Sequence, residues 1–121
     1  MPIRAVIVDD EPPARTRIRR LLADHPDIDL VAECGDGASA VQAIEAAAPD
    51  LVFLDIQMPE LDGFDVLQAL DSPRLPEIIF VSAFDRYAMR AFKVHALDYV
   101  LKPVEPDRLA EALAHARLRL A

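Results

Sequence analysis

Five polar side chains directly follow apolar runs of the sequence, and their types could do chemistry together. Three are carboxylates, one is a hydroxyl and one is an ammonium: Asp9, Asp10, Asp55, Ser82 and Lys102. Carboxylates crowded at one place repel one another. A divalent cation such as Mg²⁺ relieves this repulsion, because it prefers oxygen ligands, and it keeps waters that phosphate oxygens can replace. The set therefore indicates metal-assisted phosphoryl transfer.

The carboxylates and one nearby carbonyl are the candidate metal ligands. Asp10 and Asp55 are the expected direct ligands of Mg²⁺, and Asp9 is expected to act through water. Gln57 follows Asp55 by two residues, and its backbone carbonyl could supply a further oxygen. An octahedral ion with these ligands retains water positions that a phosphoryl group can take. We therefore expect Mg²⁺ as the cofactor.

The hydroxyl and the ammonium suit the phosphoryl group itself. The transition state of phosphoryl transfer spreads negative charge over the phosphate oxygens, so Lys102 and Ser82 can each stabilise one of them. Asp55 lies between them and the metal and is expected to be the nucleophile that forms an acyl phosphate. Ser82 is not predicted to be a hydrolase nucleophile, because no histidine lies near a strand end beside it.

Five short apolar runs, alternating with segments of helical periodicity, must position these side chains. The runs cover about residues 3–8, 29–33, 51–54, 78–81 and 99–101. The alternation predicts a single doubly wound α/β domain of the (βα)5 type, with a parallel sheet covered on both faces. In such sheets ligands bind beyond the carboxyl ends of the strands. The helix before Pro49 is expected to turn Val41, Ile44 and Ala48 inward, and the fourth helix to span about residues 86–93.

Composition limits the function further. The net charge of −8 argues against the domain binding nucleic acid by itself, and the arginines at 15, 17, 19 and 20 are interpreted as a solvated helix face rather than a nucleic-acid footprint. The apolar runs are too short to cross a membrane. A single cysteine, Cys34, cannot form an internal disulfide, which makes the reducing cytoplasm the expected location.

The order of the motifs resembles a known family over essentially the whole chain. The motifs are Val8-Asp9-Asp10, Asp55-Ile56-Gln57-Met58-Pro59, Asp62-Gly63, Val81-Ser82-Ala83 and Leu101-Lys102-Pro103. They resemble the receiver domains of two-component response regulators. The resemblance implies the strand order 2-1-3-4-5. It also implies that Asp55 accepts a phosphoryl group from a sensor histidine kinase, with Mg²⁺ held by Asp9, Asp10 and Asp55.

The resemblance extends to further positions around the site. It implies a cis peptide bond between Lys102 and Pro103, and it places Gln57 and Phe84 along the cleft, where they would tune the lifetime of the phosphoryl group. It implies no enzyme in the usual sense, but a phosphoacceptor that catalyses its own phosphorylation and dephosphorylation.

Residues 82–99 are more specifically similar to receivers of the LytTR (AlgR/LytR) class. Regulators of that class usually carry a DNA-binding domain after the receiver. We expect residues 1–121 to be one receiver domain without an output domain, so that any contact with DNA would need an output domain outside this chain. Whether the receiver stands alone or the output domain was left off stays open.

Tyr99 resembles the aromatic switch residue of the family. As Ser82 is drawn toward the phosphoryl group, the Tyr99 ring would move into the space behind it. The affected surface would comprise the fourth helix, the fifth strand and the fifth helix, through which activated copies are expected to form a homodimer. The alternative is that Tyr99 is an ordinary residue of an amphipathic strand.

Two other functions compete with a signalling switch. A Mg²⁺-dependent phosphatase with an aspartyl-phosphate intermediate would need an acid–base residue two positions after the nucleophile, where Gln57 stands, and a substrate cap for which 121 residues leave no room. A receiver-like binding module that is never phosphorylated would not need Asp55, Ser82 and Lys102.

Overall fold

The strands and helices alternate along residues 2–121, which are the residues that the computed structural model describes. The strands are β1 (Ile3–Val8), β2 (Ile28–Cys34), β3 (Leu51–Asp55), β4 (Glu77–Ser82) and β5 (Asp98–Leu101). The helices are α1 (Pro12–Leu22), α2 (Gly37–Ala47), α3 (Gly63–Ala69), α4 (Ala88–Lys93) and α5 (Pro106–Leu120). The predicted (βα)5 architecture is confirmed.

All strand pairs are parallel, and the strand order is β2-β1-β3-β4-β5, as predicted. The chain runs outward from β1 to β2 and then returns to the other side of β1 with β3, so the order reverses between β1 and β3. The register pairs Val8 with Leu54, and Ser82 with Leu101. The residues that follow β1, β3, β4 and β5 therefore share one edge of the sheet, where such folds bind their ligands.

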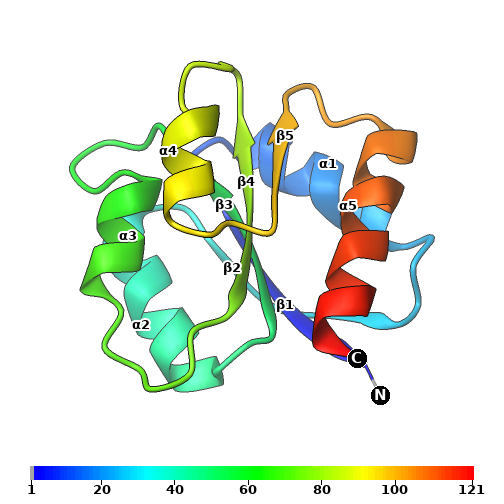
Figure 1. Ribbon diagram of the computed structural model, residues 1–121, viewed down its shortest axis with the longest axis horizontal. Helices are drawn as coiled ribbons and strands as arrows, with labels where there is room; N and C mark the ends of the chain where they lie inside the picture. Colours follow the sequence, from blue (N-terminus) through cyan, green and yellow to red (C-terminus); the bar gives the residue numbers. More distant parts are fainter. Residues whose placement is uncertain (1) are drawn as a thin grey trace.

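The helices cover the two faces of the sheet (Figure 1). α1 and α5 pack on one face around Phe53, while α2, α3 and α4 pack on the other around Phe80. Alternate residues of the central strands point to opposite faces, and both sets are buried. This two-sided burial explains why these strands are continuous apolar runs.

The loop after β3 is held by a capped helix. Asp62 and Asp65 form a capping box at the start of α3, in which each side chain accepts a hydrogen bond from the other residue's backbone N–H. Gly63 follows the cap, and its N–H donates to the Ile56 carbonyl at 2.9 Å. A Cβ at Gly63 would lie 2.7 Å from the Asp55 carbonyl oxygen. Only glycine allows α3 to begin this close to the end of β3.

Several boundaries differ by one or two residues from the sequence-based predictions: β3 also includes Asp55, β4 spans Glu77–Ser82 and β5 begins at Asp98. β2 extends one residue further at each end than residues 29–33. α2 ends at Ala47, and Ala48 is exposed with φ 47°, so the prediction that Ala48 points inward was wrong. α4 begins at Ala88 rather than near residue 86, because residues 83–87 form the loop beside the site. Among the described residues, no helix has the length and apolar character that a membrane span requires.

Candidate functional site

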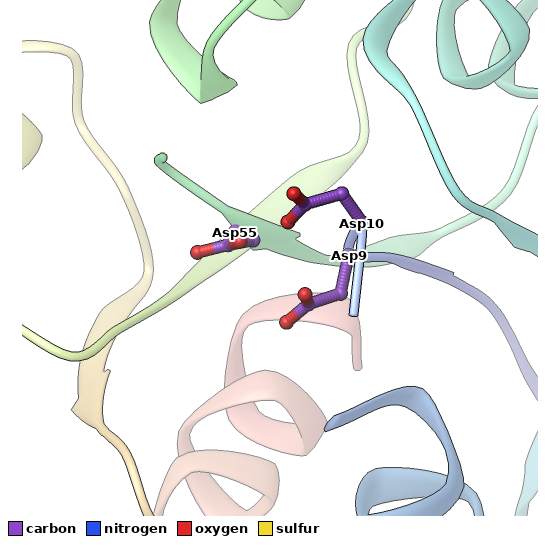
Figure 2. A group of neighbouring side chains, drawn as sticks. All are labelled: Asp9, Asp10 and Asp55. Carbon is purple, nitrogen blue, oxygen red and sulfur yellow. The ribbon is translucent and has the colours of Figure 1, made fainter. Parts of the chain in front are cut away.

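Three carboxylates meet at the carboxyl ends of β1 and β3. Asp9, Asp10 and Asp55 each contribute an oxygen, and these oxygens lie within 4.8 Å of one another. Figure 2 shows Asp9 and Asp10 at the end of β1 beside Asp55 of β3. Asp9 and Asp55 are only 1% and 4% exposed. Burying like charges so closely is unfavourable, which marks the cluster as more than a structural feature.

Lys102, from the loop after β5, supplies the cluster's cation. Its Nζ lies 2.8 Å from Asp9 Oδ2, 3.7 Å from Asp55 Oδ2 and 3.5 Å from Glu11 Oε1. Burial lowers the pKa of Lys102, but its contact with Asp9 and the charges of Asp55 and Glu11 raise the pKa by more. Lys102 is therefore held charged, and one positive charge faces several carboxylates.

The pKa of Asp55 is raised by its burial and by the excess of negative charge in the cluster. Burial raises the pKa of Asp55, and the charge of Asp9 raises it further. Lys102 opposes these effects and Asp10 adds to them, which leaves the pKa of Asp55 at about 7. Without another cation, Asp55 therefore retains a proton over much of the pH range in which an isolated aspartate is ionised.

The donor set fits a hard divalent cation. Asp9 Oδ2 is buried, and the Lys102 ammonium lies 2.8 Å from it. Asp10, which is half-buried, and Asp55 offer further oxygens near the same point. An all-oxygen set whose negative charge is only partly balanced by one ammonium suits Mg²⁺.

Ser82 ends β4 and is 1% exposed. Its Oγ accepts a hydrogen bond from the Phe84 N–H at 3.1 Å, and its carbonyl accepts one from the Lys102 N–H at 2.8 Å. The Phe84 carbonyl in turn accepts a hydrogen bond from the Tyr99 hydroxyl. The backbone of Phe84 thus connects the Ser82 hydroxyl to the half-buried Tyr99 of β5. The Lys102–Pro103 peptide bond is cis.

Sequence reasoning missed two supports of the site. Arg15 of α1 donates from its guanidinium to the Asp9 carbonyl at 2.6 Å and lies beside Glu33, so it is not simply solvated. The Glu11 N–H donates to Asp9 Oδ1 at 2.9 Å. Both groups orient the end of β1. The sequence did contain a signal for Arg15, because it lies close in sequence to the acidic pair. A helix that directly follows a strand can bring such a side chain back to the end of that strand.

A second contact crosses the rim of the site. Gln57, in the loop after β3, donates from its side-chain amide to the Tyr87 hydroxyl at 2.9 Å. Tyr87 precedes α4, so the contact joins two loops that are 30 residues apart. No pattern in the sequence relates Gln57 to Tyr87, because their meeting depends on the path of the residue 83–87 loop.

A parallel sheet in this order, with carboxylates after β1 and β3 and a lysine after β5, defines the receiver type of domain. Residues 5–114 match the response regulator receiver domain family. The chain therefore belongs to this family and is a receiver domain of a two-component response regulator.

Two curated relatives show how similar other members are. An uncharacterized response regulatory protein of Yersinia pestis is 48% identical over 111 residues, which cover 92% of this chain and 47% of that protein. The transcriptional regulatory protein BtsR of Escherichia coli strain K12 is 44% identical over 115 residues, which cover 95% of this chain and 48% of that protein. The chain thus spans about half the length of the curated relatives that it matches.

Solved structures agree with the fold. The REC domain of AraT, a response regulator from Geobacillus stearothermophilus, superposes with a TM-score of 0.89 at 31% identity, covering 99% of this chain and 96% of that one. The response regulatory domain of mrkE from Klebsiella pneumoniae gives a TM-score of 0.88 at 30% identity, covering 97% of both chains.

Proposed function

We propose that the chain is a phosphorylation-dependent switch in which Asp55 accepts a phosphoryl group from a sensor histidine kinase. The observation that carries this proposal is the position of Asp55, buried between the carboxylates of Asp9 and Asp10 and the ammonium of Lys102. A structural role alone does not explain why the fold keeps such an arrangement, whereas phosphoryl transfer needs every group in it.

In this proposal Asp9, Asp10, Asp55 and the backbone carbonyl of Gln57 hold Mg²⁺. When bound, the ion supplies positive charge that offsets the carboxylates and the transferred phosphate oxygens. The crowding of three carboxylates and the raised pKa of Asp55 support this role, because a nearby cation relieves both.

Asp55 would act as the nucleophile. A carboxylate oxygen of Asp55 forms a bond to phosphorus as the bond between phosphorus and the kinase imidazole nitrogen breaks, and the electron pair of that bond stays on the nitrogen. Lys102 and Ser82 would each contact one oxygen of the phosphoryl group. Attack of water on phosphorus later returns the Asp55 carboxylate and inorganic phosphate. The domain thereby promotes its own phosphorylation and dephosphorylation.

The signal would leave the site through Ser82. A phosphoryl oxygen that draws the Ser82 hydroxyl toward Asp55 competes with the hydrogen bond from the Phe84 N–H. Since the Phe84 carbonyl holds the Tyr99 hydroxyl, a change at Ser82 biases the position of Tyr99. This physical connection supports Tyr99 as the switch residue.

The output surface would be formed by α4, β5 and α5. Large apolar side chains are exposed on all three elements: Met89 (70%), Phe92 (77%), Leu101 (47%) and Leu118 (80%). Exposed apolar groups of this kind favour association. We expect phosphorylation, or its beryllium fluoride mimic, to promote a homodimer through this surface. An unchanged sedimentation coefficient on activation would contradict the dimer.

The class of regulator follows from residues 82–99, whose similarity to LytTR receivers we retain as part of the proposal. An output domain that binds DNA would control transcription, because this domain, with its net charge of −8, is poorly suited to do so. Relatives named transcriptional regulatory protein BtsR support that role. The single buried Cys34 is in keeping with the reducing cytoplasm as the location.

Intact mass spectrometry tests the central claim. Incubation with Mg²⁺ and acetyl phosphate should add one phosphoryl group to the wild-type domain and none to Asp55→Asn. Omission of Mg²⁺ should also prevent the adduct. A folded wild-type domain that binds Mg²⁺ but gains no mass would overturn the proposal, and an adduct that persists in Asp55→Asn would show that another residue is the acceptor.

A further inference from the structure

The loops that follow β3 and β4 are joined by a contact between side chains. Gln57 Nε2 donates to the Tyr87 hydroxyl at 2.9 Å, and Gln57 follows the phosphoacceptor Asp55 by two residues. Gln57 is itself exposed. Without a partner, an exposed glutamine side chain samples several rotamers. The contact therefore selects one position for an amide group beside the mouth of the site.

Tyr87 is in turn held from two sides. Arg86 donates to the same Tyr87 hydroxyl at 3.1 Å. The guanidinium carbon of Arg86 lies 4.4 Å from the centre of the Phe84 ring and 5.0 Å from the centre of the Tyr87 ring. The Tyr87 ring also lies 6.4 Å from that of the buried Phe64. These contacts make Tyr87 a fixed anchor for the more mobile Gln57.

The same group of contacts reaches both sides of the mouth. Phe84 follows Ser82 by two residues, as Gln57 follows Asp55. Arg86 stacks on Phe84 and donates to Tyr87, and Tyr87 accepts from Gln57. The loops after β3 and β4 are thus joined by one continuous set of side chains, which begins two residues after Asp55 and two residues after Ser82.

We propose that Tyr87 is a positioning residue that holds the Gln57 amide across the mouth of the site and thereby slows hydrolysis of the phosphoryl group on Asp55. This inference rests on the proposed function. Hydrolysis requires a water molecule to approach phosphorus from the solvent side, and side chains held over a site restrict such water. Loss of the Tyr87 hydroxyl frees Gln57 and opens that approach.

The test is a double-mutant cycle on the rate of dephosphorylation. The wild type, Tyr87→Phe, Gln57→Ala and the double variant are phosphorylated with acetyl phosphate and Mg²⁺. The donor is then removed, and the loss of the phosphoryl adduct is followed by intact mass. Tyr87→Phe keeps the ring with its contact to Phe64 and its place beside the Arg86 guanidinium, and it removes the hydroxyl together with the hydrogen bonds from Gln57 and Arg86. Thermal unfolding of each variant controls for stability.

We expect Tyr87→Phe to speed dephosphorylation roughly three- to tenfold, the range that a single solvated hydrogen bond can explain. Because Tyr87 acts through Gln57, the double variant should lose its phosphoryl group at the rate of Gln57→Ala. An unchanged rate in Tyr87→Phe, or additive effects in the double variant, would overturn the inference. A wild type that forms no adduct would instead remove the proposed function.

Discussion

Two buried or half-buried aspartates at opposite ends of the sheet have opposite electrostatic surroundings. Asp98 opens β5 and accepts hydrogen bonds from Arg108 at 2.6 and 3.1 Å and from the Tyr99 N–H at 2.7 Å. His115 Nδ1 lies 3.1 Å away. Burial raises the pKa of Asp98, but Arg108 and the Tyr99 N–H lower it by more. Asp98 is thus stabilised as an anion by groups of this chain.

Asp55, which ends β3, has the reverse balance. Burial and the charge of Asp9 raise its pKa to about 7, and Lys102 offsets them only in part. The comparison shows that the fold can neutralise a carboxylate with its own residues when the role is structural. At the site it leaves negative charge that either a proton on Asp55 or an added cation must balance.

The largest expected effect concerns Mg²⁺. Replacement of residues that only orient a metal ligand typically lowers metal affinity 10–100-fold. If Asp55 is a direct ligand, as proposed, Asp55→Asn should therefore weaken Mg²⁺ binding by about a hundredfold or more. Asp98→Asn, the matched change at the other cluster, should leave the affinity unchanged. Isothermal titration calorimetry measures both. Equal affinities of wild type and Asp55→Asn would remove the distinction between the clusters.

A smaller effect is expected on stability. Asp98→Asn should lower the free energy of unfolding by about 1–2 kcal/mol, because Arg108 loses its anion while a third of its side chain stays solvated. Asp27→Asn is the matched control: Arg117 contacts Asp27 in the same two-pronged manner, but Asp27 is 42% exposed, so its loss should cost less than about 1 kcal/mol. Urea unfolding measures the free energy of unfolding of both variants. If Asp27→Asn and Asp98→Asn lost the same amount, burial would not explain the stability contributed by Asp98.

A third effect is a pH dependence of stability in the absence of Mg²⁺. The pKa of Asp55 rises from 3.8 to about 7 on folding, so the folded state holds the additional proton between these values. The stability that this proton contributes is present below about pH 4 and is lost as pH rises through 7. Relative to Asp55→Asn, the wild type should therefore lose stability as pH rises over this window.

Thermal unfolding between pH 4 and 8 measures this loss. Saturating Mg²⁺ should reduce it at the upper end of the range, since the cation favours the ionised carboxylate. A constant difference between wild type and Asp55→Asn across this range would mean that Asp55 is ionised without a metal, as Asp98 is.

The fold and the membership of the acidic cluster could be predicted because both depend on local patterns. Apolar runs that alternate with helical periodicity determine a parallel sheet, and the carboxyl ends of its strands converge whatever the details of packing. Asp9, Asp55 and Lys102 therefore meet through topology alone. The strand order came from the resemblance to receiver domains.

The contacts around the cluster could not be predicted because they depend on tertiary detail. The Gln57–Tyr87 bond requires the particular path of the loop before α4. The Asp98–Arg108 pair requires the rotation of α5 against β5. Ala48 fits the apolar period of α2, but its backbone adopts a left-handed conformation directly before Pro49. The helix therefore ends before Ala48, whose side chain does not point inward.

Phe84 accepts a hydrogen bond at its carbonyl from Tyr99 and donates one from its N–H to Ser82. Within one residue only two torsions, φ and ψ, separate those groups, since the peptide units on either side are planar. The two hydroxyls are therefore coupled through a single residue with two rotatable backbone bonds. A proline at position 84 would remove the N–H that donates to Ser82, and a glycine would widen the range of both torsions. Most other side chains would leave the connection intact.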